Sequence, residues 1–274
     1  MEPRNRHADY YKNHTPSMPQ ESVHPYLKNW AQGLRGPSNL MLKEGTTAWK
    51  AIEALNNKTA MINAASETTM VDDGVGTIME TLKKLGIDDN TIVIYTSDQG
   101  ASYGHNGLFG NTSWSFPFTA HNINMQIPLI LSHPGKIKAG VKSDKIINQY
   151  DLFPTLLEYA GMKDKTIANS PGKSFMPFLQ GNSIKKWDDA AFFEFVTVRV
   201  IRTSKWKYMK RLDDEEEPNT LYDLNNDPDE KINLIDDPAY AKTRDSLDKR
   251  LTAFFTKYSD SKYDVWNGGS AKGI

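Results

Sequence analysis

The chain has 274 residues, of which 38% are hydrophobic and 24% charged, the balance of a globular protein rather than a disordered or fibrous one. Lys and Arg number 33 against 34 Asp and Glu, so the formal charge of -1 gives no electrostatic reason to expect nucleic acid or an anionic membrane as a partner. No stretch reaches the ~18 apolar residues of a membrane span, and the absence of cysteine excludes disulfides and cysteine metal ligands.

The first part of the chain does not resemble the start of an α/β domain. Residues 1–45 are rich in Pro, His, Asn and Gly, which predicts irregular surface structure. The opening residues are polar and lack the apolar segment of a signal peptide. Because α/β domains usually begin with a buried strand, this segment is either a long surface excursion or the interior of a longer domain.

Residues 46–85 follow a helical pattern, which is best defined from Met70 to Leu85. Apolar residues recur there at the spacing of a single helix face, namely Val71, Val75, Ile78, Met79, Leu82 and Leu85. Gly86 occupies the place of the left-handed residue that often ends a helix. The pattern predicts an amphipathic helix that ends at Leu85.

Two short apolar runs follow and predict strands. Thr91–Thr96 is typical of a buried parallel strand, and Ile127–Leu131 is a second run of the same kind. We expect a shorter strand at Ile146–Tyr150 and then a helix over Asp151–Ala160, with Asp151 near its N-cap. Helix, turn and strand in succession predict the α/β unit of a layered sheet.

The pattern changes after about residue 186. Ala191–Ile201 and Trp206–Leu212 are β-branched and aromatic, which predicts antiparallel strands. Thr220–Leu224 predicts a further short strand, and Pro238–Tyr258 a final amphipathic helix. We therefore expect an α/β body in residues 1–185 and a small α+β subdomain in residues 186–274.

The segment Thr96-Ser-Asp-Gln-Gly100 stands directly after the first predicted strand. Ligands of open α/β sheets collect beyond the carboxyl ends of the strands. Asp98 and Gln99 offer two hard oxygen ligands, which suit Ca²⁺ or Mg²⁺ better than zinc. On these residues alone a simple turn or helix cap explains the pentapeptide as well, and such a metal site needs more than two ligands.

A glycine-rich loop follows over residues 104–110 and contains His105. Such a loop can direct a histidine and backbone amides toward an anion. Each of these segments is weak evidence alone, and their order along the chain carries the argument.

In that order the segments resemble the sulfatase family, over roughly residues 60–255. The matching motifs are Asp72-Asp-Gly-Val-Gly76, Asn90-Thr-Ile-Val-Ile-Tyr-Thr-Ser-Asp-Gln-Gly100, Gln126-Ile-Pro-Leu-Ile130, Asp151-Leu-Phe-Pro-Thr-Leu-Leu-Glu-Tyr-Ala-Gly161, Ile201-Arg-Thr-Ser-Lys-Trp-Lys-Tyr208 and Leu221-Tyr-Asp-Leu-Asn-Asn-Asp-Pro228 with Glu230-Lys-Ile-Asn-Leu234. The resemblance implies an alkaline-phosphatase-like layered sheet, here incomplete at its N-terminal side, with a C-terminal α+β subdomain that carries an antiparallel sheet.

The resemblance also implies hydrolysis of sulfate esters with one divalent cation, usually Ca²⁺ and less often Mg²⁺. Asp98 and Gln99 match the family's second pair of metal ligands, and the first pair of aspartates has no counterpart here. The family's nucleophile is a formylglycine made from a C/S-x-P-x-R motif. The Ser-x-Pro sequences at Ser17, Ser115 and Ser132 lack the arginine or the expected place in the chain. We therefore expect this chain to lack the nucleophile segment and to be inactive alone.

Two positions depart from the family's pattern. His105 stands one place earlier than the family's histidine, and Asn111 replaces the lysine that contacts the sulfate. Asparagine donates hydrogen bonds but carries no charge, so it would stabilise an anionic transition state less than lysine does. Both residues are still candidates for substrate binding.

Three interpretations follow. The leading one is a sulfatase-family chain whose substrate is a sulfated small molecule or glycan, expected to be periplasmic or secreted because members of the family commonly are. A phosphatase or phosphonate hydrolase of the same fold is an alternative. A different class is a non-catalytic or split sulfatase-like protein that binds a sulfated glycan without turnover.

Overall fold

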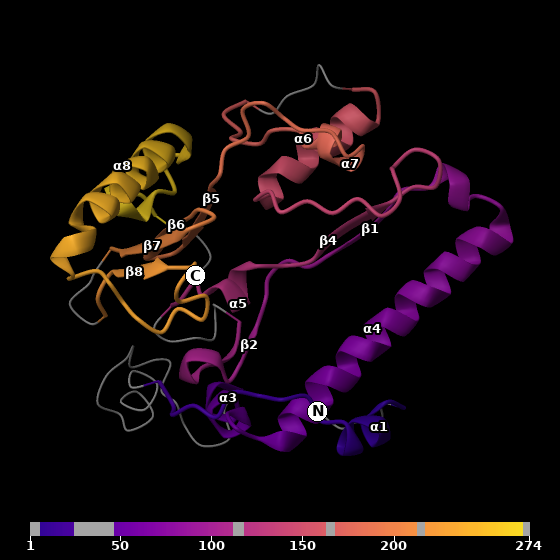
Figure 1. Cartoon of the computed structure of the whole chain (residues 1–274), viewed down its shortest axis with the longest axis horizontal. Helices are drawn as coiled ribbons and strands as arrows, with labels where there is room; N and C mark the ends of the chain where they lie inside the picture. The colour runs from indigo at the N-terminus through magenta and orange to yellow at the C-terminus, as the bar shows by residue number, and fades with distance from the viewer. Residues whose placement is uncertain (1–5, 25–46, 112–117, 163–167, 213–216, 271–274) are drawn as a thin grey trace. The chain divides into compact units, whose positions relative to one another are not determined.

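The computed structural model describes residues 6–24, 47–111, 118–162, 168–212 and 217–270. The chain divides into two compact units, Met1–Gly135 and Lys136–Ile274, which are considered separately below (Figure 1). This division differs from the boundary expected near residue 186, which stays a prediction. Among the described residues, no helix has the length and apolar character needed to cross a bilayer.

Three helices of the first unit are α1 (Ala8–Asn13), α3 (Thr47–Ala54) and α4 (Lys58–Leu85). The predicted helical stretch is therefore interrupted between α3 and α4, where Asn56 has a φ of 58°. The Asn57 side chain caps α4 by accepting hydrogen bonds from the backbone of the first turn. At the other end Gly86 has a φ of 64° and closes the helix at Leu85, as predicted.

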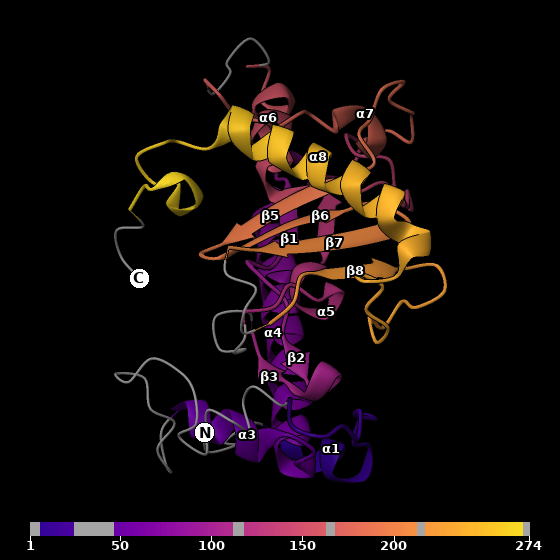
Figure 2. The same cartoon turned by 90° about the vertical axis from the view of Figure 1, so that its left-hand side faces the viewer.

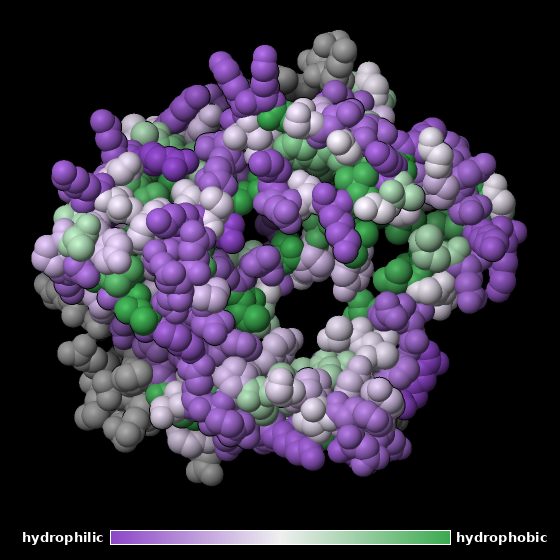
Figure 3. Space-filling view, in the orientation of Figure 1, coloured by the Kyte–Doolittle hydropathy of each residue, from purple (hydrophilic) through white to green (hydrophobic). Residues whose placement is uncertain are grey.

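The apolar face of α4 is buried only near its start, where Met61 and Ile62 are 9% and 8% exposed. Further along, Val71 is 53% exposed and Ile78 is 57% exposed. Hydrophobic residues, in green, reach the surface at several places in Figure 3. The exposed hydrophobic residues of α4 are Met70, Val71, Ile78, Met79 and Leu85. Within the first unit, the described residues therefore leave most of this apolar face uncovered.

Strand β1 (Val93–Thr96) follows a short 3-10 turn, η1 (Asp88–Asn90), and pairs with β4 (Leu129–Ser132). The two strands run antiparallel, with Val93 opposite Ser132 and Thr96 opposite Leu129 (Figure 1). The prediction of a buried parallel strand is wrong for the described residues, because a short apolar run specifies extended backbone but neither the direction nor the number of its partners. Both strands are at most half-buried.

In the chain, β1 is followed by a small hairpin of β2 (Ser102–Tyr103) and β3 (Phe109–Gly110), which are joined by the 3-10 turn η2 (His105–Gly107). The short helix α5 (Asn122–Met125) then precedes β4. The candidate site residues all lie in the part of the chain between β1 and α5.

The second unit begins with α6 (Gln149–Tyr159) and α7 (Met176–Leu179). The strand expected at Ile146–Tyr150 is wrong, because Asn148 and Asp151 form a reciprocal capping box that starts α6 at Gln149. Asp151 is the third helical residue, near the N-cap Asn148, as predicted.

A four-stranded antiparallel sheet follows, in the order β5 (Ala191–Phe195), β6 (Val198–Arg202), β7 (Trp206–Arg211) and β8 (Thr220–Asp223). The run predicted as Ala191–Ile201 is two strands, with the turn residue Val196 at a φ of 49°. Past η3 (Pro238–Tyr240), helix α8 (Ala241–Tyr258) lies across one face of this sheet (Figure 2). A last 3-10 turn, η4 (Val265–Asn267), follows.

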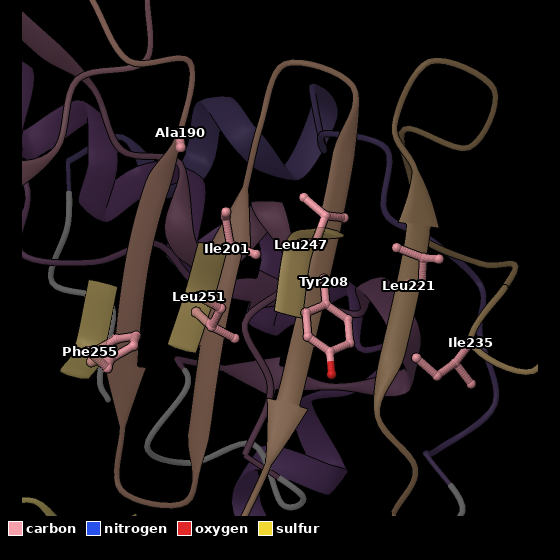
Figure 4. Packing of buried hydrophobic residues seen from close by; sticks show 8 residues of the cluster. All are labelled: Ala190, Ile201, Tyr208, Leu221, Ile235, Leu247, Leu251 and Phe255. Atoms are coloured by element: carbon pink, nitrogen blue, oxygen red, sulfur yellow. The ribbon is translucent and has the colours of Figure 1, made fainter. Parts of the chain in front are cut away.

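The core of this unit lies between α8 and the sheet. Its buried residues are Ala190, Ile201, Tyr208, Leu221, Ile235, Leu247, Leu251 and Phe255 (Figure 4). Leu247, Leu251 and Phe255 are spaced by four residues, so one helical stripe meets alternate residues of the strands. The antiparallel sheet and final helix expected toward the C-terminus are therefore present, while the subdomain bounds 186–274 stay a prediction.

Candidate functional site

Asp98 and Gln99 lie in the turn that leaves β1, and both are exposed. One carboxylate oxygen of Asp98, Oδ1, accepts a hydrogen bond of 2.9 Å from the backbone N–H of Gln99. The hydroxyl of Ser97 lies 3.2 Å from that same oxygen and 2.8 Å from the carbonyl oxygen of Gln99. Local hydrogen bonds therefore fold the turn back on itself and fix the direction of the aspartate.

The turn continues into Gly100, which lies directly against α5. The N–H of Gly100 donates a 2.9 Å hydrogen bond to the carbonyl oxygen of Asn124. A Cβ atom at Gly100 would lie 2.2 Å from the carbonyl oxygen of Ile123, closer than any side chain tolerates. Close backbone approach thus explains the glycine after Gln99.

The β2–β3 hairpin brings Asn111 back toward this turn. Ser102 pairs with Gly110, so Asn111 is the next residue on the returning strand and stands beside Ala101 in the register. Asn111, Asp98 and Gln99 therefore belong to the open end of the hairpin. The sequence alone placed Asn111 thirteen residues after Asp98 without showing this return.

His105 belongs to the opposite end of the hairpin, in the η2 turn. There the backbone meets the N-terminal segment, where the N–H of His24 donates to the carbonyl oxygen of Gly107 at 3.0 Å. Between this tip and Asn111 lie at least two residues of strand, or roughly 7 Å. The structure thus separates His105 from the other three candidates, and the roles of all four as site residues stay predictions.

The donor set fits part of a site for a hard cation. The Asp98 carboxylate and the Gln99 carboxamide are oxygen ligands of the kind that Ca²⁺ and Mg²⁺ prefer. Ca²⁺ takes about six to eight such ligands. Among the described residues no group of three or more His, Cys, Asp or Glu side chains could hold a metal ion. Asp98 and Gln99 by themselves therefore do not complete such a site.

Sequence reasoning missed Ser102 and Asn124. Ser102 is fully buried and its hydroxyl donates a 3.1 Å hydrogen bond to Oδ1 of Asn124, which is 1% exposed. These residues are 22 positions apart, and no periodicity or motif links them. Only the folded chain shows that they meet directly behind the turn that carries Asp98.

A cavity of about 140 Å³ lies within the second unit, where Asp151, Lys173, Trp187, Phe254 and Tyr258 contribute to its wall. Burial raises the pKa of the Asp151 carboxyl, although the backbone N–H groups of Lys173 and Asn148 donate to its two oxygens. The indole N–H of Trp187 donates to the carbonyl oxygen of Ile146. These polar groups thus already bond to protein. We therefore interpret the cavity as a gap in the packing where α6, β5 and α8 meet, and not as a second candidate site.

Two family models match this chain, and each covers more than half of it. The Sulfatase model matches residues 5–162, and the model for the C-terminal part of N-sulphoglucosamine sulphohydrolase matches residues 114–257. The chain belongs to the sulfatase family.

Among curated relatives, an N-acetylglucosamine-6-O-sulfatase from Bacteroides thetaiotaomicron is 29% identical over 233 residues, which are 81% of this chain and 40% of that protein. Arylsulfatase K from Bos taurus is 28% identical over 192 residues, 66% of this chain and 34% of that protein. The multifunctional alkaline phosphatase superfamily protein PehA from Trinickia caryophylli is 26% identical over 255 residues, 85% of this chain and 47% of that protein. The chain spans a third to a half of the length of these relatives.

Solved structures give the fold. A protein in complex with its substrate D-glucosamine-2-N,6-O-disulfate superposes with a TM-score of 0.70 at 23% identity, over 98% of this chain and 65% of that one. The phosphonate monoester hydrolase of Agrobacterium radiobacter superposes with a TM-score of 0.59 at 27% identity, over 74% and 41%. The alkaline-phosphatase-like α/β fold, with an antiparallel sheet toward the C-terminus, is therefore confirmed.

Proposed function

We propose that this chain is part of a sulfatase that hydrolyses sulfate esters of a small sugar or glycan and binds Ca²⁺, or less readily Mg²⁺, through Asp98 and Gln99. The observation that carries this proposal is the turn after β1, where local hydrogen bonds orient Asp98 and the hairpin register returns Asn111. Family membership supplies the reaction class. The relatives named for sulfated sugars suggest the substrate class.

Each residue has a distinct part in this proposal. The Asp98 carboxylate and the side-chain carboxamide oxygen of Gln99 would hold the cation, which would supply Lewis-acid chemistry toward the sulfate oxygens. The Asn111 carboxamide donates a hydrogen bond to a sulfate oxygen and adds no charge, so its contribution to transition-state binding is smaller than that of a lysine. His105 is the weakest member of the set, because it lies at the far end of the hairpin.

We also propose that the nucleophile and the first pair of metal-binding aspartates are not among these 274 residues. The chain holds no cysteine, and no Ser-x-Pro sequence continues with the arginine of the family's motif. Polypeptide corresponding to the unmatched part of the relatives would supply these groups. The exposed apolar face of α4 supports this, since it has the character of a surface that other polypeptide covers.

That same face favours a second candidate function, a split or non-catalytic member of the family. Such a chain would bind a sulfated glycan, or a complementary polypeptide, without turnover of its own. A phosphonate hydrolase is a less favoured alternative. It shares the fold, but the match of residues 114–257 to a sulphohydrolase C-terminal model supports a sulfatase.

Isothermal titration calorimetry of calcium binding to the full chain tests the metal proposal. We expect weak binding, with a dissociation constant of about 10⁻⁴ to 10⁻³ M, at the weak end of the range for protein calcium sites, because affinity depends on the number of charged ligands. Asp98→Asn should weaken it at least tenfold, roughly 1.4 kcal/mol. Asp72→Asn is the matched control, because Asp72 is an exposed aspartate on α4. Equal affinities of the two variants would refute the assignment of Asp98.

An assay with an aryl sulfate and with glucosamine 6-sulfate tests the proposal about the nucleophile. No turnover is expected from the 274 residues alone. Turnover that persists through repeated purification would show that the nucleophile lies within this chain. Binding of the sulfated sugar without turnover, unaffected by Asp98→Asn, would favour the non-catalytic candidate.

A further inference from the structure

Asn124 makes contacts on both sides of the turn that carries Asp98 and Gln99. Its backbone carbonyl accepts the N–H of Gly100 at 2.9 Å. Its side-chain oxygen Oδ1 accepts the hydroxyl of Ser102 at 3.1 Å. Asn124 of α5 thus bonds both to Gly100, which ends the turn, and to Ser102, which begins β2.

The contact surface between α5 and the turn leaves no room for adjustment. Gly100 already lies so close to Ile123 and Asn124 that a Cβ atom would be 2.2 Å from one carbonyl oxygen and 3.1 Å from the Asn124 carbonyl carbon. Ser102 and Asn124 are both buried, at 0% and 1% exposure. A displacement of Asn124 would therefore move the backbone of the turn directly.

The Asn124 side chain also has an unused donor. Its amide nitrogen Nδ2 is buried and has no acceptor among the described residues. Leaving a buried donor unsatisfied costs about 1–3 kcal/mol, so packing alone does not favour asparagine here. Unsatisfied buried groups in native proteins call for a specific explanation, of which a role at a functional site is one.

We propose that Asn124 is a positioning residue of the candidate site, which clamps the Asp98–Gly100 turn onto α5 through Ser102 and Gly100. The clamp sets the direction in which Asp98 and Gln99 present their oxygens. Its relevance to catalysis depends on the proposed metal site, whereas the clamp itself is a property of the metal-free chain. The two are therefore separable by experiment.

Amide hydrogen exchange of the full chain without metal tests the clamp. The Gly100 amide is the reporter, because it donates its hydrogen bond to the backbone carbonyl oxygen of Asn124. The Ser66 amide, in the buried part of α4, reports on general stability. We expect Asn124→Ala to accelerate exchange at Gly100 about tenfold relative to Ser66. Gln126→Ala, an exposed substitution just beyond the same helix, is the matched control and should leave the ratio unchanged.

Ser102→Ala provides a second, milder variant that keeps the proposal testable if Asn124→Ala does not fold. It should also accelerate Gly100, and the double variant should exchange no faster than Asn124→Ala alone, because both remove the same hydrogen bond. An unchanged ratio of Gly100 to Ser66 in the single variants, or additive effects in the double variant, would overturn the clamp.

Calcium affinity then separates this proposal from the one it rests on. With the clamp and the metal site both correct, Asn124→Ala weakens calcium binding, because fewer molecules hold Asp98 and Gln99 in the binding-competent direction. If wild-type chain binds no calcium but Gly100 responds as expected, the metal proposal fails and the clamp stands. If calcium affinity is lost in Asp98→Asn yet unchanged in Asn124→Ala, the positioning role is refuted.

Discussion

Helix α4 and helix α8 are both amphipathic, but they have different surroundings. The apolar stripe of α8 is covered by four strands, and Leu251 is 1% exposed. The corresponding stripe of α4 leaves Ile78 57% exposed and Leu85 65% exposed. Apolar periodicity therefore predicts a helix equally well in both places, whereas burial depends on whether the partner surface is present (Figures 3 and 4).

The difference extends to charged residues. In the second unit Nζ of Lys207 lies 2.7 Å from Oε1 of Glu230, and each side chain is 2% exposed. Arg199 pairs there with Asp264 at 2.7 Å and stacks on Phe255, with 4.3 Å to the ring centroid. Among the described residues, α4 forms ion pairs near its surface, such as Asp73 with Arg6 at 2.5 Å. Both buried pairs belong to the C-terminal sheet, through Lys207 of β7 and Arg199 of β6.

The largest effect is expected from breaking the buried pair of the second unit. Lys207→Met leaves the Glu230 carboxylate buried without its cation, which should reduce the free energy of unfolding by about 3–5 kcal/mol. Lys207→Met with Glu230→Gln removes both charges and should recover part of that loss. Urea unfolding measures both. A single variant as stable as wild type would show that the pair does not stabilise this core.

A pair of matched truncations tests the comparison of the two helices directly. Leu251→Ala should lower the free energy of unfolding by about 2–5 kcal/mol, because it leaves a cavity in a packed core. Ile78→Ala should change stability by no more than about 0.5 kcal/mol, because its side chain is mostly in solvent. The same urea titration applies to both variants. A large loss for Ile78→Ala would mean that the α4 face is covered in solution, for example by self-association.

Self-association can be separated from folding with a charged variant. Ile78→Lys introduces repulsion on the α4 face without removing a buried contact. If the face mediates association, sedimentation should show a lower apparent mass for this variant at equal concentration. An unchanged apparent mass would show that the α4 face does not mediate self-association and is exposed to solvent, as in the structure.

Local signals in the sequence predicted much of this fold. Gly86 marked the end of α4, the β-branched runs marked the C-terminal strands, and Asp98 was correctly expected directly after β1. Each of these depends on residues close together in the chain. The sulfatase motifs identified the family for the same reason, since each is a short segment with fixed spacing.

What the sequence did not predict depends on pairing between distant segments. The antiparallel pairing of β1 with β4 joins residues that are far apart in the chain, from Val93 with Ser132 to Thr96 with Leu129. The contact of Asn124 with Ser102 and Gly100 is likewise set by the fold. The false strand at 146–150 is a different error, since the capping box of Asn148 and Asp151 was visible in the sequence and overrode the apolar residues.

The smallest expected effect concerns the attachment of α1 to α4, where Asp73 accepts hydrogen bonds from His7 at 2.5 Å and from Arg6. These bonds, that from His7 first, lower the pKa of the Asp73 carboxyl below its usual 3.8. The unfolded chain therefore binds this proton more readily, so the attachment is fully present above about pH 4 and is lost as the pH falls through the lower, folded pKa.

Limited proteolysis of the α1 segment at pH 7 and in acid measures this attachment, and Asp73→Asn removes the charge at every pH. The variant should be cleaved a few times faster than wild type at pH 7 and at nearly the same rate in acid, because wild-type Asp73 is then protonated. Tyr11→Phe is the informative control. It removes the 2.8 Å contact with Thr69 that also joins α1 to α4, but contains no group that titrates in acid, so its cleavage should exceed that of wild type at both pH values. If Asp73→Asn behaves in the same way, the ion pair does not govern the pH dependence of α1.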